Sequence, residues 1–300
     1  MNDKLQTLQA QYSKKVLITG AGGQLGTQLN KTLNNFKYLD ARTRNELDIA
    51  QPYISLKSQI SKIQPDIIIN TAAYTDVDKA EENPDQAYQV NAESVLNLAR
   101  ICASLDITLV HYSTDYVFDG RKETPYHEND KPSPLSVYGE SKLVGERHII
   151  LSSCRHIILR TSWLYGRFGK NFAKTIAQLA EKETHLKVIS DQISIPTSTA
   201  WLADVTNKIL HDIIQQPNNK QYYGLFHCTP MQHTSWYGFA EVLLKDTRQA
   251  PPLISISSSE YHKNMIRPKY SVLNSDKLKK TFCITLPTWQ ELVDDFINHN

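Results

Sequence analysis

The feature that most constrains the fold is a glycine-rich turn that follows the first apolar run of the chain. The segment KVLITG (residues 15–20) has the β-branched and apolar character of a buried strand. Directly after it, Gly20, Gly23 and Gly26 stand at three-residue spacing as the chain enters a helix-like segment. Glycines allow a tight strand-to-helix turn and let a pyrophosphate approach the backbone at a helix N-terminus. Such turns also occur in sheets that bind nothing, so the turn needs support from its surroundings.

Further strand and helix signals alternate through the N-terminal half. Buried strands are predicted at 66–70, 107–113 and 156–163, with a helix between Pro84 and Leu105. This alternation is typical of a parallel sheet with crossover helices. We therefore expect an α/β protein, a Rossmann-type doubly wound parallel sheet. Shorter elements with more proline follow, and they predict a smaller C-terminal substrate-binding lobe that ends in an amphipathic helix at 288–297.

Composition excludes several classes of function. Lys and Arg total 33 against 31 Asp and Glu, and the formal net charge of +2 provides no broad basic field for a nucleic acid or an anionic membrane. No segment approaches the roughly 20 apolar residues of a membrane span, and residues 1–15 are polar. The four cysteines form no CxxC pair. We expect a cytoplasmic protein with reduced cysteines, no metal, and no nucleic-acid or membrane partner.

The GxxGxxG spacing is typical of short-chain reductases, and the residues after it bear on the choice of cofactor. Asp40 stands about twenty residues beyond Gly20, where a carboxylate would accept a hydrogen bond from an adenosine ribose. Arg42 and Arg44 follow and could instead hold a 2′-phosphate. The sequence therefore leaves NADH and NADPH both open.

A tyrosine and a lysine in PLSVYGESKLVGE carry the catalytic prediction. Tyr138 and Lys142 are four residues apart on a helix-like segment and would face the same way. A nearby ammonium favours phenolate and lowers the pKa of a phenol, which makes it a better proton donor. Upstream, Ser113 or Thr114 ends a predicted strand at the carboxyl edge of the sheet, where ligands bind in such folds. Tyr138 is therefore predicted to be the acid catalyst.

With these residues in place, the chain resembles the dTDP-4-dehydrorhamnose reductases, which are extended short-chain dehydrogenases/reductases. The resemblance runs from about Lys15 to the C-terminus. It rests on the segments TGAGGQLG, NTAAYTDVDKAE, HYSTDYVFDG, SPLSVYGESKLVGE, RTSWLYG, NFAKT, DQ followed by PT, and RPKYSVL. Together these motifs are highly specific, whereas each alone is not.

The resemblance implies that NADPH or NADH reduces the 4-keto group of dTDP-4-dehydro-L-rhamnose. It implies an NAD(P)-binding Rossmann domain at 1–170 and about 186–230, and a substrate-binding lobe at about 171–185 and 231–300. The implied catalytic residues are Tyr138, Lys142 and Thr114. The implied cofactor contacts are Gly20, Gly23, Gln24, Leu25, Gly26, Asp40, Asp48, Ile49, Ala73, Tyr74, Thr75, Tyr112, Tyr138 and Lys142, and the implied substrate contacts are Thr114, Asp115 and Trp163.

Two of these positions, and two further candidates, keep a purely structural alternative. Trp163 can be ordinary core at a strand end, and Asp115 can cap the loop that begins there. Asn171 can be a helix cap or a substrate contact, and Arg267 can bind a diphosphate or lie in a solvated turn.

The chain departs from the family pattern at two positions. Ser194 stands where the family usually has glycine, and Gln28 stands where some relatives place an acidic metal ligand. We therefore expect no metal and a monomer or homodimer. Two other functions share the fold: another sugar-nucleotide reductase or epimerase, and a non-catalytic NADP-binding regulatory subunit.

Overall fold

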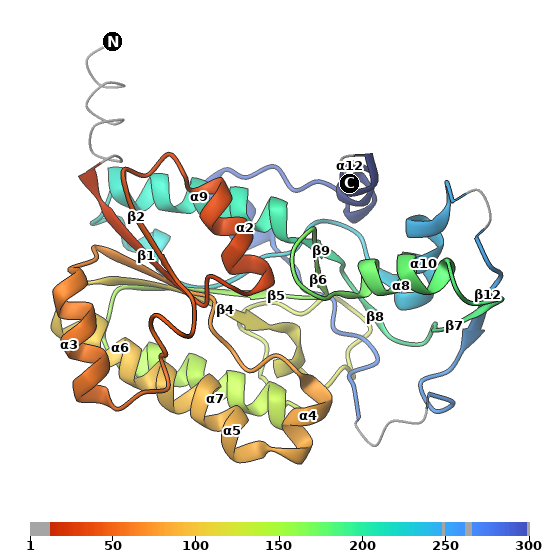
Figure 1. The fold of residues 1–300 in the computed structure, drawn as a ribbon, viewed down its shortest axis with the longest axis horizontal. Helices are drawn as coiled ribbons and strands as arrows, with labels where there is room; N and C mark the ends of the chain where they lie inside the picture. Colours follow the sequence, from red (N-terminus) through yellow and green to blue (C-terminus); the bar gives the residue numbers. More distant parts are fainter. Residues whose placement is uncertain (1–12, 248–249, 262–265, 299–300) are drawn as a thin grey trace, which may run out of the picture.

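The computed structural model describes residues 13–247, 250–261 and 266–298, and its centre is a parallel β-sheet (Figure 1). Six strands pair in the order β10-β5-β4-β3-β1-β2. In chain order they are β1 (Lys15–Thr19), β2 (Tyr38–Arg42), β3 (Ile67–Asn70), β4 (Thr108–Thr114), β5 (His156–Thr161) and β10 (Gly224–His227). All five pairings are parallel. The α/β fold predicted from the sequence is confirmed.

Helices cover both faces of the sheet (Figure 1). Successive strand residues point to opposite faces, and Val16 and Ile18 accordingly pack in one buried cluster while Leu17 packs in another. The first cluster includes residues of α2 (Gln24–Thr32), α9 (Thr199–Gln215) and α11 (Asp276–Phe282). The second includes residues of α3 (Tyr53–Ile63), α6 (Ser94–Ser104) and α7 (Val137–Leu151). Burial on both faces explains why the strands read as continuous apolar runs.

The strand order reverses between β1 and β3. From β1 the chain moves outward to β2, and then returns to place β3 on the other side of β1. At such a switch point the loops after two neighbouring strands separate and leave a crevice at their carboxyl ends. The loops after Thr19 and Asn70 border that crevice, so the fold itself indicates where a ligand binds.

A smaller group of elements lies beside the carboxyl edge of the sheet (Figure 1). It contains α8 (Phe172–Ala180), α10 (Trp236–Leu244), and the parallel pair β7 (Leu186–Ile189) with β12 (Leu253–Ile256). Helix α12 (Trp289–Asn298) packs against it through Trp289 and Val293. Three short strand segments, β6 (Leu164–Tyr165), β8 (Ile193–Ser194) and β9 (Thr197–Ser198), connect this group to the sheet, and β11 (Thr234–Ser235) pairs with β8.

The predicted strands and the terminal helix are confirmed within one or two residues, but the helix expected between Pro84 and Leu105 is interrupted. It consists of α5 (Pro84–Tyr88), a π-helical turn η1 (Gln89–Glu93) and α6. Short helices α4 (Val77–Glu82) and η2 (Asp115–Val117) complete the loops after β3 and β4. Among the described residues, no helix is long and apolar enough to cross a membrane. The polar segment 1–12 lies outside the described residues.

Candidate active site

The glycine turn after β1 forms a cradle that only glycine fits at two positions. Gly20 has φ +73°, and a Cβ there would lie 2.6 Å from the backbone nitrogen of Ala72. A Cβ on Gly26 would lie 2.4 Å from the carbonyl oxygen of Gly20. The N-cap of α2 is Gly23, which has no side chain to accept from the first amide groups of the helix. Those amides and the positive end of the helix dipole suit a pyrophosphate.

Two adjoining cavities follow the crevice at the carboxyl edge of the sheet. The smaller, of about 300 Å³, includes the following predicted cofactor residues: Gly20, Gly23, Asp48, Ile49, Ala73 and Tyr74. The larger, of about 690 Å³, includes Gln24, Leu25, Gly26, Thr75, Tyr112, Thr114, Asp115, Tyr138, Lys142 and Trp163. Their combined lining brings together every predicted site residue except Asp40. One continuous cleft can therefore hold a dinucleotide and a second ligand end to end.

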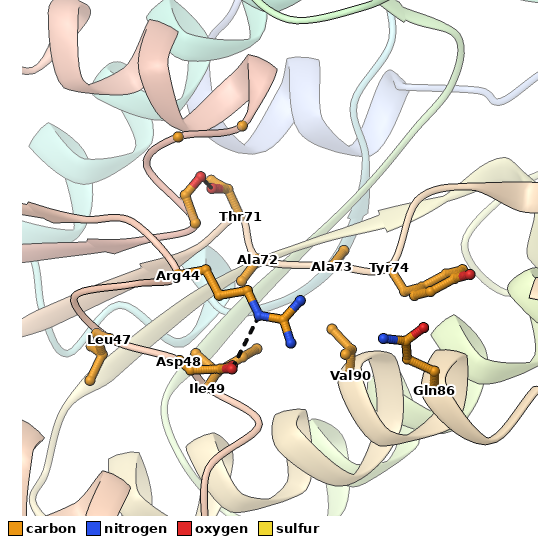
Figure 2. A pocket seen from close by; sticks show the side chains of 13 residues that line it. Arg44, Leu47, Asp48, Ile49, Thr71, Ala72, Ala73, Tyr74, Gln86 and Val90 are labelled. Carbon is orange, nitrogen blue, oxygen red and sulfur yellow. Dashed lines mark hydrogen bonds and ion pairs between the residues drawn. The ribbon is translucent and has the colours of Figure 1, made fainter. Parts of the chain in front are cut away.

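The smaller cavity contains a basic side chain at its mouth. Arg44 lies across the cavity and forms a 3.1 Å ion pair with Asp48, as Figure 2 shows. Asp40, by contrast, accepts two hydrogen bonds from Arg42 at 2.6 and 3.1 Å. Hydrogen bonding and charge from Asp40 raise the pKa of Arg42. Asp40 thus pairs with Arg42 and lines neither cavity, whereas Arg44, which pairs with Asp48, lines the smaller one.

Tyr138 lies at the start of α7 in the larger cavity, beside the end of β4. Ser136 caps the helix by accepting from the Gly139 amide at 3.1 Å. Burial raises the pKa of Tyr138 to about 12, although a hydrogen bond with Thr114 lowers it. Thr114 Oγ1 in turn accepts from the Tyr116 amide and donates to Asp115. The raised pKa is opposite to the direction expected from a nearby ammonium.

The position of Lys142 explains that difference. Its side chain is buried against β4, where Nζ donates to the Tyr112 carbonyl oxygen at 2.6 Å and lies 3.2 Å from His111 Nε2. Burial lowers the pKa of Lys142 to about 8. His111 Nδ1 lies 3.0 Å from Asn70 Nδ2. The lysine is thus held in a buried polar chain that crosses from β4 to β3.

Asp115 is held by residues far away in the sequence. Its carboxylate accepts from Ser194 Oγ at 3.0 Å and from Ser271 Oγ at 2.5 Å. Burial raises the pKa of Asp115 to about 6, and these hydrogen bonds act in the opposite direction. Ser194, which stands at a position where glycine was expected, therefore supplies one of the donors. The Asp115 carboxylate links Ser271 of the C-terminal segment to the end of β4 and also lines the larger cavity.

Aromatic and basic side chains also line the larger cavity. Trp163 has φ +43° and stacks on Trp236, with ring centroids 3.5 Å apart. This strained backbone holds the indole at the cavity wall and outside the buried core. Arg267 also lines the cavity and forms a 2.9 Å ion pair with Asp78.

Asn171 is a helix cap, which is one of the two roles that the sequence left open. It caps α8 by accepting from the Lys174 amide at 3.1 Å, and its Nδ2 donates to Gln24 Oε1 at 2.7 Å and to the Gly166 carbonyl. Through Gln24 it ties the smaller group of elements to the glycine turn.

Sequence reasoning missed three residues of the site: Asn70, His111 and Trp236. The sequence could have revealed two of them. Asn70 follows three isoleucines in DIIIN, and His111 follows Leu109 and Val110 in ITLVHYS, so both are polar residues in predicted buried strands. Such residues need buried partners. Nothing in the sequence around Trp236 distinguished it from a core residue of a helix.

Comparison with known proteins agrees with this geometry. The family model described as the RmlD substrate binding domain matches residues 14–300. The dTDP-4-dehydrorhamnose reductase of Aggregatibacter actinomycetemcomitans is 41% identical over 92% of this chain and 96% of its own. That of Escherichia coli strain K12 is 36% identical over 94% of this chain and 97% of its own.

Solved structures give the same result. A dTDP-4-dehydrorhamnose reductase from Bacillus anthracis, solved in complex with NADP, has a TM-score of 0.89 and 34% identity, covering 96% of this chain and 99% of its own. The UDP-glucose 4-epimerase of Thermus thermophilus, at 17% identity and a TM-score of 0.77, shares the fold. The chain therefore belongs to the family of the RmlD substrate binding domain, together with the dTDP-4-dehydrorhamnose reductases that it matches along nearly its whole length.

Proposed function

We propose that this protein reduces the 4-keto group of dTDP-4-dehydro-L-rhamnose with NADPH and produces dTDP-L-rhamnose. One observation carries the proposal: Tyr138, Thr114 and Lys142 line the same cavity as the glycine turn of α2. The family relationship supplies the sugar nucleotide, since relatives along nearly the whole chain are named for this substrate.

The residues of the smaller cavity fit a dinucleotide. At Gly20 and Gly26 the turn packs so tightly on neighbouring protein atoms that a Cβ has no room, and this tight turn presents the N-terminus of α2 to a pyrophosphate. Arg44 favours NADPH, because its guanidinium at the cavity can pair with a 2′-phosphate. Asp40, which would favour NADH, already accepts from Arg42. When bound, the reduced nicotinamide supplies the hydride for the carbonyl carbon.

The protein supplies the proton and the orientation. Tyr138 donates its phenolic proton to the carbonyl oxygen as negative charge develops there, which stabilises the transition state more than the ground state. Thr114 holds the phenol through the hydrogen bond that lowers its pKa. The ammonium form of Lys142 stabilises the phenolate that remains. Trp163 packs against the sugar from the opposite wall.

We assign the parts of the chain accordingly. Residues 1–170 and about 186–230 hold the cofactor, and about 171–185 and 231–300 hold the sugar nucleotide. Asp115 then has two roles, a contact with the sugar and the anchor for Ser194 and Ser271. We further propose that the enzyme acts in the cytoplasm as a monomer or homodimer, which light scattering on the purified protein would decide.

The test is the loss of nicotinamide absorbance when enzymatically generated dTDP-4-dehydro-L-rhamnose is added to the protein with NADPH, and separately with NADH. We expect faster oxidation of NADPH, and a fall in kcat of at least about a hundredfold in Tyr138→Phe, the usual contribution of general acid catalysis. Absence of oxidation by a folded protein that still binds NADPH would contradict the proposal and favour a regulatory subunit or a different sugar.

A further inference from the structure

We propose that His111 is a positioning residue for Lys142, with its Nε2–H donating a hydrogen bond to the Lys142 amine while Asn70 fixes the tautomer that does so. The inference rests on the proposed function for its place in the reaction, but the hydrogen bond itself can be tested without substrate. His111 is completely buried in the middle of β4 and contacts neither cavity. Its role is therefore exerted through Lys142.

The direction of the hydrogen bonds follows from one backbone amide. The Ala72 N–H can only donate, and it lies 3.2 Å from Asn70 Oδ1, which also accepts from Thr19 Oγ1 at 2.7 Å. The other end of the Asn70 amide must then be its NH₂ group, which faces His111 Nδ1 at 3.0 Å. An NH₂ group donates, so Nδ1 accepts and carries no proton.

A neutral imidazole with an unprotonated Nδ1 carries its proton on Nε2. Burial and the charge of Lys142 lower the pKa of His111 well below 6.5, so the ring is neutral. Nε2–H then faces Lys142 Nζ at 3.2 Å. An ammonium has only donors and cannot accept a hydrogen bond from this N–H, whereas the neutral amine has a lone pair that accepts it. The chain of donors thus stabilises the amine form of Lys142.

Other groups around Lys142 act on the same equilibrium. From β4 the Tyr112 carbonyl accepts from Nζ and holds the side chain in place. Glu146, one turn further along α7, raises the pKa of Lys142, but Arg160 of β5 binds that carboxylate at 2.6 Å. Tyr138 and Asp115 line the same cavity as Lys142. His111 is the neighbour that favours the uncharged amine by donating to it.

This arrangement has a use in the reaction. The ammonium stabilises the Tyr138 phenolate, and a lysine whose charged and neutral forms differ little in free energy can release and regain a proton in each turnover. Burial lowers the pKa of Lys142 to about 8 against the opposing charge of Glu146. The His111 hydrogen bond brings the two forms closer still.

The sign of one measured shift tests the inference. In the cofactor-free protein, the pKa of Lys142 is measured by NMR titration of ¹³C-labelled lysine, with the Lys142 signal assigned by its loss in Lys142→Met. We expect His111→Phe to raise that pKa by about one unit, a tenfold change in the ratio of amine to ammonium, as removal of one buried hydrogen bond predicts. If His111 instead accepted from the ammonium, the same substitution would lower the pKa.

A control variant and a second variant of the same hydrogen-bond chain complete the test. His156, at the start of β5, is partly buried, bonds the Cys154 carbonyl and lines neither cavity, so His156→Phe should leave the Lys142 titration unchanged. Asn70→Leu frees His111 to turn an unprotonated Nε2 toward the ammonium, and should also raise the pKa of Lys142. This variant serves if His111→Phe does not fold.

Turnover gives a second readout. The alkaline limb of the kcat profile should move to higher pH in His111→Phe and stay in place in His156→Phe. A pKa of Lys142 that falls or stays unchanged in both His111→Phe and Asn70→Leu would overturn the inference, even in an active enzyme. Failure to reduce the sugar, with the expected pKa shifts present, would overturn the proposed function and leave the hydrogen bond standing.

Discussion

A methyl group added at Gly26 tests whether the turn after β1 is built around a bound pyrophosphate. A Cβ there would lie 2.4 Å from the Gly20 carbonyl oxygen, about 1 Å short of ordinary van der Waals contact, and 2.8 Å from both Ala21 Cα and Thr71 Oγ1. Two of these neighbours are backbone atoms, so α2 itself must move. Overpacking of this kind costs about 1–3 kcal/mol, against roughly 1 kcal/mol gained from replacing a helical glycine by alanine.

We therefore expect Gly26→Ala to reduce the free energy of unfolding by about 1 kcal/mol and to raise the Kd for NADPH at least tenfold, about 1.4 kcal/mol, because the displaced helix carries the amides that hold the phosphates. Asn30→Ala is the control, since Asn30 lies on the exposed face of α2 and lines neither cavity. Fluorescence titration with NADPH and thermal denaturation measure both quantities. Binding by Gly26→Ala within twofold of the Asn30→Ala protein would refute the reasoning.

Three further predictions concern the cofactor, a buried carboxylate and acid stability. Arg44→Ala should weaken NADPH binding by about tenfold and leave NADH binding nearly unchanged, because a 2′-phosphate loses a charged partner; equal losses in calorimetry would contradict this. Ser194→Gly removes a donor to Asp115 and should lower the free energy of unfolding in urea by about 1–2 kcal/mol; an unchanged midpoint would count against that hydrogen bond. Burial lowers the pKa of His111 well below 6.5 and that of His227 to about 3, and raises that of Asp115 to about 6. Between about pH 6 and pH 4 these three groups together bind about one more proton in the unfolded chain than in the folded one. Their contribution should make the free energy of unfolding fall by roughly 1.4 kcal/mol per unit of acidification, and His227→Gln should reduce the measured slope by about that amount.

The sheet could be predicted because its strands are short runs of apolar and β-branched residues. Ile67, Ile68 and Ile69 are consecutive, and neighbouring strand residues point to opposite faces, so both faces of the segment had to be buried. The small elements beside the sheet were less predictable. Strands such as β8 and β9 contain two residues each and form through pairing with distant segments, which leaves no periodic pattern in the sequence.

The site divides in the same way. Gly20, Tyr138 and Lys142 were predictable because their chemistry depends on neighbours a few residues away in the chain. The links of Asp115 to Ser194 and Ser271, and of Trp163 to Trp236, join positions from 73 to 156 residues apart. A single sequence taken alone does not reveal such pairs, because each partner by itself has an ordinary structural explanation.

The π-helical turn between α5 and α6 sets a limit on how the chain can vary in length. Its widened backbone brings Asn91 to Tyr74, whose amide and carbonyl it both binds, and to Ser141 Oγ on α7 at 3.0 Å. One amide thus fastens the loop after β3 to the helix that carries Tyr138. Loss of a single residue here would restore ordinary helical geometry, which leaves α6 nearly in place but removes the bulge that brings Asn91 to Tyr74 and Ser141. Deletions should therefore be rejected in this segment, although it bears no group that takes part in the chemistry.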